Sequence, residues 1–338
     1  MYNKETFFSI IIPVYNGLSH DLPLCLNSIW QQSLNEDLYE VICVDDCSTD
    51  RSQEWIKDEM PKHNNLKLIK NEKNIRQGGA RNNGVKHSKG KYILFIDQDD
   101  YYENSALNII YQHLIDTTPE LDIFVSDSAF QFKGHETKKL QLNLPCKDVL
   151  SGEEFLIKNG PALAPWRLCI KKEHLIKNEL WFVENCRIED IDWACKVMFH
   201  AKRVQYLPIL LVHYIKSDSS QTDNMYKNME ILRDNTLAAN RTLEVANDLY
   251  QNSIAKQCIL NIVDNHYNFT CKYLFGMWKS LKEKEIIVHL IQQKQSKYQL
   301  VKLAIEHPRL FCAVSNFGVP AFRMARYIKR KWRAINDK

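Results

Sequence analysis

A run of apolar residues meets a cluster of acids in Lys91-Tyr92-Ile93-Leu94-Phe95-Ile96-Asp97-Gln98-Asp99-Asp100. The aromatic and aliphatic residues of Tyr92–Ile96 predict a short buried strand. Three of the four positions that follow are carboxylates. Oxygen ligands of this kind suit Mg2+ or Mn2+, and such a cation keeps open positions that substrate phosphates fill. Because aspartate is also a common turn residue, an acidic turn without a metal is the alternative interpretation.

Strand and helix patterns alternate on both sides of this segment. Apolar runs predict strands at Phe7–Val14, Glu40–Val44, Leu66–Ile69, Tyr92–Ile96 and Leu121–Val125. The spacing of apolar residues predicts helices at Leu22–Trp30, around Trp55 and Ile56, at Gly78–Val85 and at Ala106–Ile115. Ser48–Asp50 is expected to cap the second of these helices. The alternation indicates an α/β fold with a doubly wound, mostly parallel sheet.

Polar residues stand where four of the predicted strands end. These ends are Tyr15-Asn16, Asp45-Asp46, Asn71–Asn74 and Asp97–Asp100. Ligands of open α/β sheets bind beyond the carboxyl ends of the strands. The sequence therefore predicts one ligand site at this edge of the sheet.

The alternation stops after Ser126. Further strands are predicted at Leu163–Ile170, Val204–Leu207 and Ile209–Ile215, and from about Met225 the pattern is helical. The polar segment Ser217–Asn224 is the expected boundary. We therefore expect an α/β domain over residues 1–224 and a helical region over residues 225–338.

Composition favours a soluble globular protein in a reducing cytoplasm. The 338 residues leave room for one large domain or two ordinary ones. No apolar run approaches the roughly 20 residues that span a bilayer, and the polar start of the chain gives no sign of a signal peptide. The ten cysteines are scattered without a Cys-x-x-Cys pair, so a disulfide framework is not expected.

The end of the sequence carries a concentrated positive charge. The net charge is +4, yet from Gly318 onward seven residues are Lys or Arg and one is acidic. On a helix, Ala321, Ala325, Ile328 and Trp332 would form one apolar stripe, with arginines largely opposite. A basic amphipathic helix predicts attachment to an anionic membrane surface; a helix docked on the protein is the alternative. No nucleic-acid partner is expected, because the tail is short and the body is not basic.

Four ordered motifs resemble those of family 2 glycosyltransferases, which are inverting, nucleotide-sugar-dependent enzymes of the GT-A fold. They are Pro13-Val14-Tyr15-Asn16; Val44-Asp45-Asp46-Cys47-Ser48-Thr49-Asp50; Asn74 with Gly78, Ala80-Arg81-Asn82 and Gly84; and Asp97-Gln98-Asp99-Asp100. The resemblance covers roughly residues 7–220. It implies a GT-A-like α/β domain followed by a helical C-terminal extension.

A nucleotide sugar presents a base, a ribose and a diphosphate. Tyr15 is suited to stack on the base. The resemblance implies that Asp46 accepts a hydrogen bond from the imide N–H of uracil, which favours a uridine nucleotide. Arg81 is placed to meet phosphate near the start of a helix. Capping and turn formation are the alternative for Asp45-Asp46, and an ordinary surface arginine is the alternative for Arg81. The resemblance adds three further residues to the nucleotide site: Pro13, Asn74 and Gly78.

The same resemblance assigns separate tasks to the acids of the fourth motif. Asp97 would contact the ribose or reach the metal through water, and Asp99 would bind Mn2+ or Mg2+ directly. The cation would bridge the two phosphates and stabilise the charge on the departing nucleoside diphosphate.

Inverting transfer also needs a carboxylate that takes the proton of the acceptor hydroxyl. The segment Arg187-Ile188-Glu189-Asp190-Ile191-Asp192-Trp193 resembles the family's Glu-Asp motif, in which the aspartate is the base. We expect Asp190 to be the base and Glu189 to orient the acceptor or the base. Asp192 is the rival, because all three acids could serve only to favour a helix dipole.

Three further positions are less specific. Trp166, in Pro165-Trp166-Arg167-Leu168-Cys169-Ile170-Lys171-Lys172, resembles a residue beside the family's acceptor site and is equally suited to a core position. Lys216 stands where the family often has an arginine that meets the diphosphate. His213 is a candidate metal ligand or a structural histidine. Cys47 replaces the usual glycine of the second motif, which leaves the geometry of that turn open.

Together these features predict a metal-dependent inverting glycosyltransferase. It would move a hexosyl or N-acetylhexosaminyl group from a UDP-sugar to a hydroxyl of a glycan or lipid-linked glycan in bacterial surface polysaccharide synthesis. The basic tail would hold it at the inner face of the cell membrane. For the rest of the helical region, packing and a homodimer contact are both open roles. A nucleotidyltransferase and a non-catalytic nucleotide-sugar scaffold are the alternatives.

Overall fold

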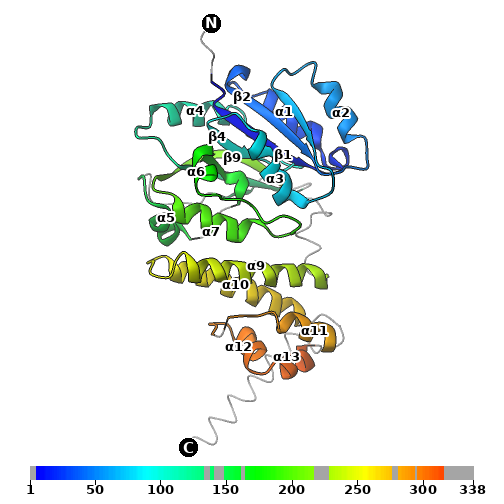
Figure 1. The fold of residues 1–338 in the computed structure, drawn as a ribbon, viewed down its shortest axis with the longest axis vertical. Helices are drawn as coiled ribbons and strands as arrows, with labels where there is room; N and C mark the ends of the chain where they lie inside the picture. The colour runs from blue at the N-terminus through cyan, green and yellow to red at the C-terminus, as the bar shows by residue number, and fades with distance from the viewer. Residues whose placement is uncertain are drawn as a thin grey trace, which may run out of the picture. The chain divides into compact units, whose positions relative to one another are not determined.

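The computed structural model describes residues 5–132, 138–140, 148–160, 164–216, 228–275, 281–293 and 295–315. These residues form two compact units (Figure 1). The first contains residues 5–216 with Asn252–Ala255, and the second contains residues 228–251 and 256–315. The boundary predicted at Ser217–Asn224 and the basic tail both lie outside the described residues.

The first unit is built on a nine-stranded mixed sheet. In chain order the strands are β1 (Phe8–Val14), β2 (Tyr39–Asp45), β3 (Leu66–Lys70), β4 (Tyr92–Phe95), β5 (Tyr101–Tyr102), β6 (Ile123–Phe132), β7 (Lys138–Leu140), β8 (Leu168–Lys171) and β9 (Val204–Lys216). Their order in the sheet is β3-β2-β1-β4-β8-β6-β9-β5, and β7 pairs with β6. The first four strands are parallel, and β9 is parallel to β6, whereas β8 and β5 are antiparallel to their neighbours. The predicted α/β fold with a mostly parallel sheet is confirmed.

Helices connect these strands and cover the sheet (Figure 1). They are α1 (Leu22–Trp30), α2 (Ser52–Glu59), α3 (Arg76–His87), α4 (Ala106–Asp116), α5 (Gly152–Asn159), α6 (Lys172–Lys177) and α7 (Asp190–His200), with 3-10 turns η1 (Gly17–His20), η2 (Glu36–Leu38) and η3 (Pro165–Arg167).

Strand β1 shows why the apolar runs are continuous rather than alternating. Ile10 and Ile12 belong to a buried cluster that includes residues of α1 and α4. The intervening Ile11 points to the other face, where a Cβ on Gly84 of α3 would lie 2.4 Å from Ile11 Cγ2. Because helices cover both faces, every residue of the strand is buried.

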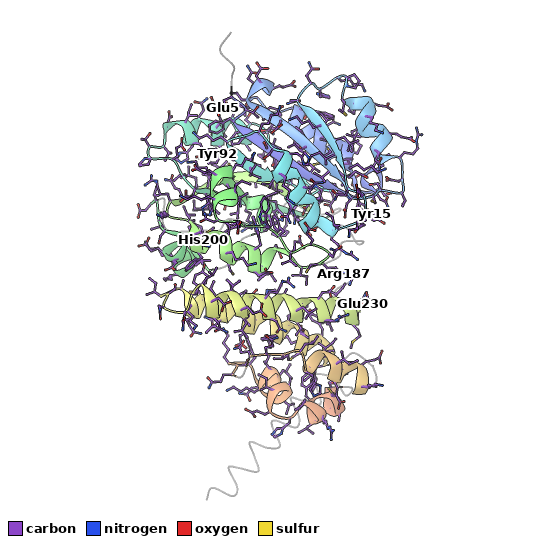
Figure 2. The ribbon with its side chains drawn as sticks, viewed as in Figure 1. Glu5, Tyr15, Tyr92, Arg187, His200 and Glu230 are labelled. Atoms are coloured by element: carbon purple, nitrogen blue, oxygen red, sulfur yellow. The ribbon has the colours of Figure 1, made fainter. Side chains whose placement is uncertain are left out.

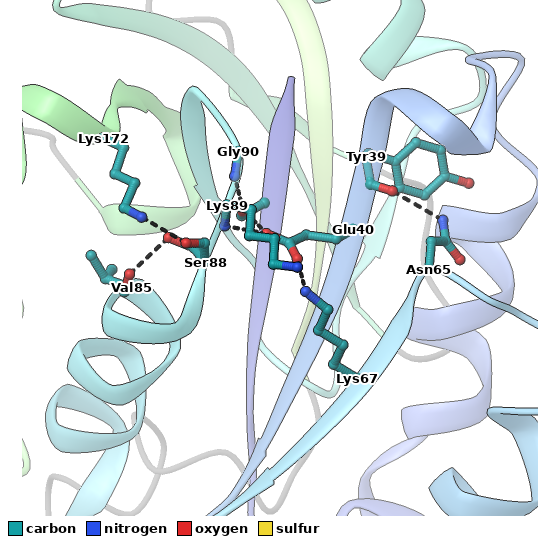
Figure 3. A network of polar contacts seen from close by, with 10 residues as sticks. Tyr39, Glu40, Asn65, Lys67, Val85, Ser88, Lys89, Gly90 and Lys172 are labelled. Atoms are coloured by element: carbon teal, nitrogen blue, oxygen red, sulfur yellow. Dashed lines mark hydrogen bonds and ion pairs between the residues drawn. The ribbon is translucent and has the colours of Figure 1, made fainter. Parts of the chain in front are cut away.

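A buried carboxylate joins the starts of the parallel strands at the edge opposite the predicted site (Figure 3). Glu40, at the beginning of β2, accepts hydrogen bonds from Ser9 Oγ in β1 (2.5 Å) and from the backbone N–H of Lys89 before β4 (2.5 Å). It also forms an ion pair with Lys67 of β3. Burial disfavours the charge of Glu40, but these donors outweigh burial and lower its pKa.

Three local predictions were wrong in detail. The strand expected over Leu163–Ile170 begins at Leu168, because Pro165–Arg167 forms a 3-10 turn. The two strands expected at Val204–Leu207 and Ile209–Ile215 are the single strand β9, whose pairing with β6 shifts register near Asp127. The N-cap of α2 is Arg51, without a side-chain cap, and Ser48 Oγ accepts a hydrogen bond from the backbone of Asn16 instead. Asp50, within the predicted capping segment, does accept from the backbone N–H of Ser52 at the start of α2 (3.0 Å).

The second unit consists of helices in its described residues. They are α9 (Met229–Asp248), α10 (Lys256–Leu274), α11 (Leu281–Val288), α12 (Gln299–Glu306) and α13 (Pro308–Ser315). Residues of α9, α10, α12 and α13 share one buried cluster, which includes Leu232, Tyr267, Val301 and Phe311. Within the described part of the chain, no helix combines the length and the apolar character needed to cross a membrane.

Candidate functional site

The carboxyl ends of β1, β2, β3 and β4 lie at one edge of the sheet, because these strands are parallel neighbours. Tyr15, at the end of β1, is joined to the acidic motif after β4. Its backbone N–H donates to Gln98 Oε1 (2.9 Å), and Gln98 Nε2 donates back to the carbonyl of Tyr15 (2.9 Å). The side chain of Tyr15 is 46% exposed, which leaves its ring available to a ligand. In Figure 2 Tyr15 and Arg187 lie toward the same edge of the first unit.

Asn16 fastens the end of β1 to the turn after β2. Its backbone N–H donates to Ser48 Oγ (2.9 Å), and its Oδ1 accepts from the N–H groups of Thr49 (2.7 Å) and Asp50 (3.3 Å). Asn16 has a positive φ of 52°, a conformation that asparagine tolerates better than most residues. The side chain therefore organises the edge rather than facing a ligand.

Asp46 is largely occupied by the protein itself. Its carboxylate is buried and accepts from Asn71 Nδ2 (2.8 Å), Ile75 N–H (2.9 Å) and Arg76 N–H (2.8 Å). Oδ1 takes two of these bonds and Oδ2 takes one. A carboxylate oxygen can accept two hydrogen bonds, so Oδ2 has capacity for one more donor. Asn74 supports the same turn through Nδ2 to the carbonyl of Asp46 (3.1 Å).

Two neighbours of Asp46 shape its turn. Asp45 is fully buried and accepts from Gln53 Nε2 (2.7 Å), so its carboxylate ties the turn to α2. Cys47 has a φ of 65°, in the left-handed region that favours glycine. The structure thus keeps a conformation typical of glycine at this position, and Cys47 Sγ contacts the carbonyl of Asn71 at 3.3 Å.

The acids after β4 lie close enough to disfavour one another's charge. Burial and, next, the nearby charge of Asp97 together raise the pKa of Asp99 to about 6. Asp100 is fully buried; its Oδ1 accepts from the N–H of Ile215 (2.9 Å), and its Oδ2 has no hydrogen-bond partner among the described residues. Burial and the same neighbours raise its pKa.

These acids fit a divalent cation in chemistry, because crowded carboxylate oxygens are the ligands that Mg2+ and Mn2+ prefer. Over the described ranges, no three His, Cys, Asp or Glu side chains are arranged to hold a metal ion. A cation here would therefore need oxygen ligands from a bound substrate as well.

Arg81 of α3 connects the acidic motif to the predicted base motif. Its Nη2 lies 2.7 Å from Asp97 Oδ1, and its Nη1 lies 2.5 Å from Glu189 Oε1. The side chain is 3% exposed, so the alternative of an ordinary surface arginine is wrong. Its predicted contact with phosphate stays a prediction.

The acids around the start of α7 differ in their surroundings. Glu189 is buried, and burial raises its pKa to about 7 against the opposing charge of Arg81. Asp190 is partly exposed, and burial also raises its pKa. Asp192 is fully buried and accepts from Lys196 Nζ at 3.1 Å. Of the three acids, Asp190 is the one that is not fully shielded from solvent, and Arg81 lies close enough for its charge to act on the Asp190 carboxyl.

Aromatic side chains line the neighbouring part of the edge. Trp166 is partly buried and stacks on Tyr214 of β9, with ring centroids 5.9 Å apart. His213 stacks on Tyr101 (4.4 Å), and its Nε2 lies 2.8 Å from Glu103 Oε2. Lys216 ends β9, and its side chain lies outside the described residues.

Sequence reasoning assigned no individual role to several residues that build the site. Gln98 and Asn71 organise the turns around Tyr15 and Asp46, and Asn82 binds the backbone of Phe182 at both its N–H and its carbonyl (2.9 Å each). Asn82 and Gln98 stand inside the quoted motifs, so their positions were visible. Their partners were not, because Phe182 lies 100 residues further along the chain.

The chain is similar to known glycosyltransferases. A family model described as Glycosyl transferase family 2 matches residues 9–167. Poly(ribitol-phosphate) beta-glucosyltransferase of Bacillus spizizenii is 46% identical over 103 residues, which cover 29% of this chain and 16% of that protein. Poly(ribitol-phosphate) beta-N-acetylglucosaminyltransferase TarS of Staphylococcus aureus is 25% identical over 289 residues, which cover 82% of this chain and 47% of TarS. The chain thus spans less than half the length of these two relatives.

Solved structures share the fold. TarS 1-349 of S. aureus in complex with UDP-GlcNAc aligns with a TM-score of 0.67 at 20% identity, covering 92% of this chain and 89% of that one. The mannosyltransferase PcManGT of Pyrobaculum calidifontis, in complex with GDP-Man and Mn2+, aligns with a TM-score of 0.50 at 15% identity, covering 92% and 86%. These likenesses support the GT-A architecture, including its helical C-terminal part.

Proposed function

Because the chain belongs to glycosyl transferase family 2, we propose that it transfers a sugar from a UDP-sugar to a hydroxyl of a glycan or lipid-linked glycan, with inversion at the anomeric carbon. One observation carries this proposal. Arg81 contacts both Asp97 of the donor motif and Glu189 of the base motif, so the two halves of the chemistry meet at one side chain.

The donor would bind at the carboxyl edge of β1 to β4. Tyr15 offers an exposed ring for stacking on the base, and Asp46 Oδ2 retains one acceptor position for an imide N–H. Uracil presents that N–H, whereas cytosine does not. The proposed donor site consists of Pro13, Tyr15, Asp46, Asn74, Gly78, Asp97 and Lys216, with Arg81 in contact with Asp97.

Asp99, with Asp97 beside it, would hold Mn2+ or Mg2+, which when bound supplies positive charge to the departing diphosphate. The pKa of Asp99, raised to about 6 by burial and by the charge of Asp97, is consistent with this role, since a cation relieves the same repulsion. Mn2+ in the PcManGT complex is a distant precedent for the choice of ion.

Asp190 would take the proton of the acceptor hydroxyl as the new bond to the sugar forms, on the face opposite the leaving diphosphate. Its partial exposure permits an acceptor to reach it, in contrast to the buried Asp192. Glu189, held by Arg81, would keep the start of α7 in place. Trp166 would offer an aromatic face to the acceptor.

Two relatives supply the acceptor class that we propose to test. The names of both relatives include poly(ribitol-phosphate). A hydroxyl of such a polymer is therefore the first acceptor to test, with a hexosyl or N-acetylhexosaminyl group as the sugar. We further propose that residues 1–224 form the catalytic domain. Residues 225–338 would end in a basic helix that binds the inner face of the cell membrane, from the cytoplasmic side, and could include a homodimer contact.

The decisive test is calorimetric titration of UDP, GDP and CDP into the purified full chain, with and without Mn2+. We expect UDP alone to bind, and to bind more tightly with the metal. The variant Asp99→Asn should retain the weak binding measured without metal and lose the gain from Mn2+. Tighter binding of GDP or CDP would reject the assignment of Asp46, and no binding of any nucleotide would reject the donor proposal.

A further inference from the structure

We infer that Arg81 is a positioning residue, which joins the acidic motif to the base motif and does not itself bind the donor phosphates. The biochemical meaning of this inference rests on the proposed function. The contact itself can be tested without any donor or acceptor.

Burial keeps a phosphate away from the guanidinium of Arg81. Nη2 is bonded to Asp97 and Nη1 to Glu189. Nε has no hydrogen-bond partner in the described ranges, and each Nη carries a second N–H, but the side chain is only 3% exposed. A phosphate oxygen would therefore have to move one of the two carboxylates aside to reach these N–H groups. Leaving either carboxylate buried and unpaired is costly, so displacement is disfavoured.

Helix α3 also binds residues 182–185, which precede the base motif; we call residues 182–193 the base segment. Asn82, one residue along, donates Nδ2 to the carbonyl of Phe182 and accepts its N–H, both at 2.9 Å. The backbone N–H of Asn185 donates to the carbonyl of Ile75 at 3.0 Å. These bonds fix the backbone on either side of Val183.

Close packing adds to these bonds. A Cβ on Gly78 would lie 2.7 Å from the carbonyl oxygen of Val183 and 3.0 Å from Glu189 Cγ, so α3 and this segment touch without a side chain between them. The ring of Phe182 lies under Arg81, 5.4 Å from Cζ, and stacks on Trp193 of α7 at 4.0 Å. Helix α3 thus acts as a platform for residues 182–193.

Arginine suits this role because its planar fork reaches two carboxylates in different directions at once. Its charge also compensates two acids that are mostly shielded from water, 16% and 5% exposed in their side chains. A lysine could supply one charge but could not span both partners. The arrangement therefore fixes the distance between the acidic motif on β4 and the start of α7.

A double-mutant cycle tests the contact in the full chain. Urea unfolding is measured for Arg81→Met, Glu189→Gln, the double variant and the wild type. We expect the double variant to lose less stability than the two single variants lose together. The difference should be about tenfold or more in the unfolding equilibrium constant. The matched control is the exposed pair Arg51 and Glu54, 2.8 Å apart, whose cycle should show less than about threefold coupling. Additive effects at Arg81 and Glu189 would overturn the inference.

If Arg81→Met does not fold, Arg81→Lys carries the second measurement. Amide hydrogen exchange should quicken in residues 182–193 of the variant and stay unchanged in β2 and β3. Exchange that rises equally everywhere would mean a general loss of stability rather than a lost positioning contact. This readout does not depend on donor binding, so it stands even if the proposed function fails.

Nucleotide binding separates positioning from direct phosphate contact. Uridine and UDP are titrated into wild type and Arg81→Lys without a divalent cation, so that the metal role proposed for Asp97 does not affect the comparison. Positioning through Asp97 predicts that both affinities fall by the same factor, because the contact proposed for Asp97 is with the ribose that uridine and UDP share. Direct phosphate contact predicts that UDP loses affinity while uridine does not, and that result would overturn the inference.

Discussion

Asp190 and Asp192 share the first turn of α7 but differ in access, since Asp190 is partly exposed and Asp192 is fully buried against Lys196. We predict that Asp190→Asn abolishes sugar transfer and leaves UDP binding within about threefold of wild type, because only the proton acceptor is removed. The rate of transfer is measured from the UDP released, and UDP affinity is measured by calorimetry. A collapse of UDP affinity would show that Asp190 belongs to the donor site instead.

Asp192→Asn is the comparison for that experiment. It removes the charge of a fully buried carboxylate that accepts from Lys196, so we expect a stability loss of about 1–3 kcal/mol and transfer retained below the melting temperature. Loss of transfer in a folded Asp192→Asn protein, with transfer retained in Asp190→Asn, would reverse the assignment of the base.

Cys47 tests how the turn after β2 tolerates a side chain at φ 65°. Cys47→Gly removes about 1 kcal/mol of left-handed strain but adds freedom to the unfolded chain, so its stability should stay within about 1 kcal/mol of wild type. Cys47→Val should cost more than about 1 kcal/mol, because a β-branched side chain fits this region poorly. Urea unfolding measures both. Equal stability of the Val and Gly variants would contradict this account.

At the scale of elements, the starts of four strands depend on Glu40. Its pKa in the folded chain lies below the ordinary 4.5, despite burial, because Lys67, Ser9 and the Lys89 N–H stabilise its charge. A carboxylate with a lowered pKa contributes stability above its unfolded pKa, and that contribution is lost as pH falls through the folded pKa. Glu40→Gln should therefore cost about 1–3 kcal/mol at pH 7, and the difference should shrink below pH 4.5.

The measurement is urea unfolding as a function of pH. Glu173→Gln serves as the control, because Glu173 pairs with Lys171 at an exposed position and should change stability little at any pH. A difference between Glu40→Gln and wild type that stays constant down to pH 3 would mean that the charge of Glu40 is not what stabilises the network.

Helix α3 and the base segment approach each other at Gly78. Because a Cβ there would lie 2.7 Å from the carbonyl oxygen of Val183, a backbone atom, Gly78→Ala should force the two elements apart. We expect a stability loss of about 1–3 kcal/mol, together with slower transfer. Gln77→Ala, at an exposed position in the same turn, should stay within about 0.5 kcal/mol of wild type. A Gly78→Ala protein as stable and active as wild type would contradict the close approach.

At the scale of the whole molecule, the chain divides into an α/β unit and a helical unit. The basic tail after residue 318 remains a prediction from sequence. Deleting residues 320–338 should weaken binding to anionic liposomes at least several-fold and leave UDP affinity unchanged, because the tail contributes charge at the membrane and not at the strand ends. Vesicle sedimentation at two salt concentrations measures the effect. Equal binding by full-length and truncated chains would dismiss the membrane prediction.

The strands and helices of the first unit could be predicted closely because their apolar runs are long and bounded by polar turns. Leu22–Trp30 was expected and occurs with the same bounds, and β1 differs by one residue. Prediction failed where the local signal misleads. Separate strands were predicted on either side of Pro208, at Val204–Leu207 and Ile209–Ile215. The structure has the single strand β9 there, because pairing with β6 continues across a register shift.

The sequence by itself determined the order of the strands' polar ends, the family motifs and the residues proposed to carry the chemistry, because periodicity and motif spacing are local properties. Only the tertiary structure decided which of those residues meet. Arg81 and Glu189 are 108 positions apart, and their contact depends on how α3 packs on residues 182–189. Burial is the second property that the sequence does not show. Arg81 and Asp192 are both buried and form ion pairs inside the fold, because a charge that is excluded from water needs a partner there.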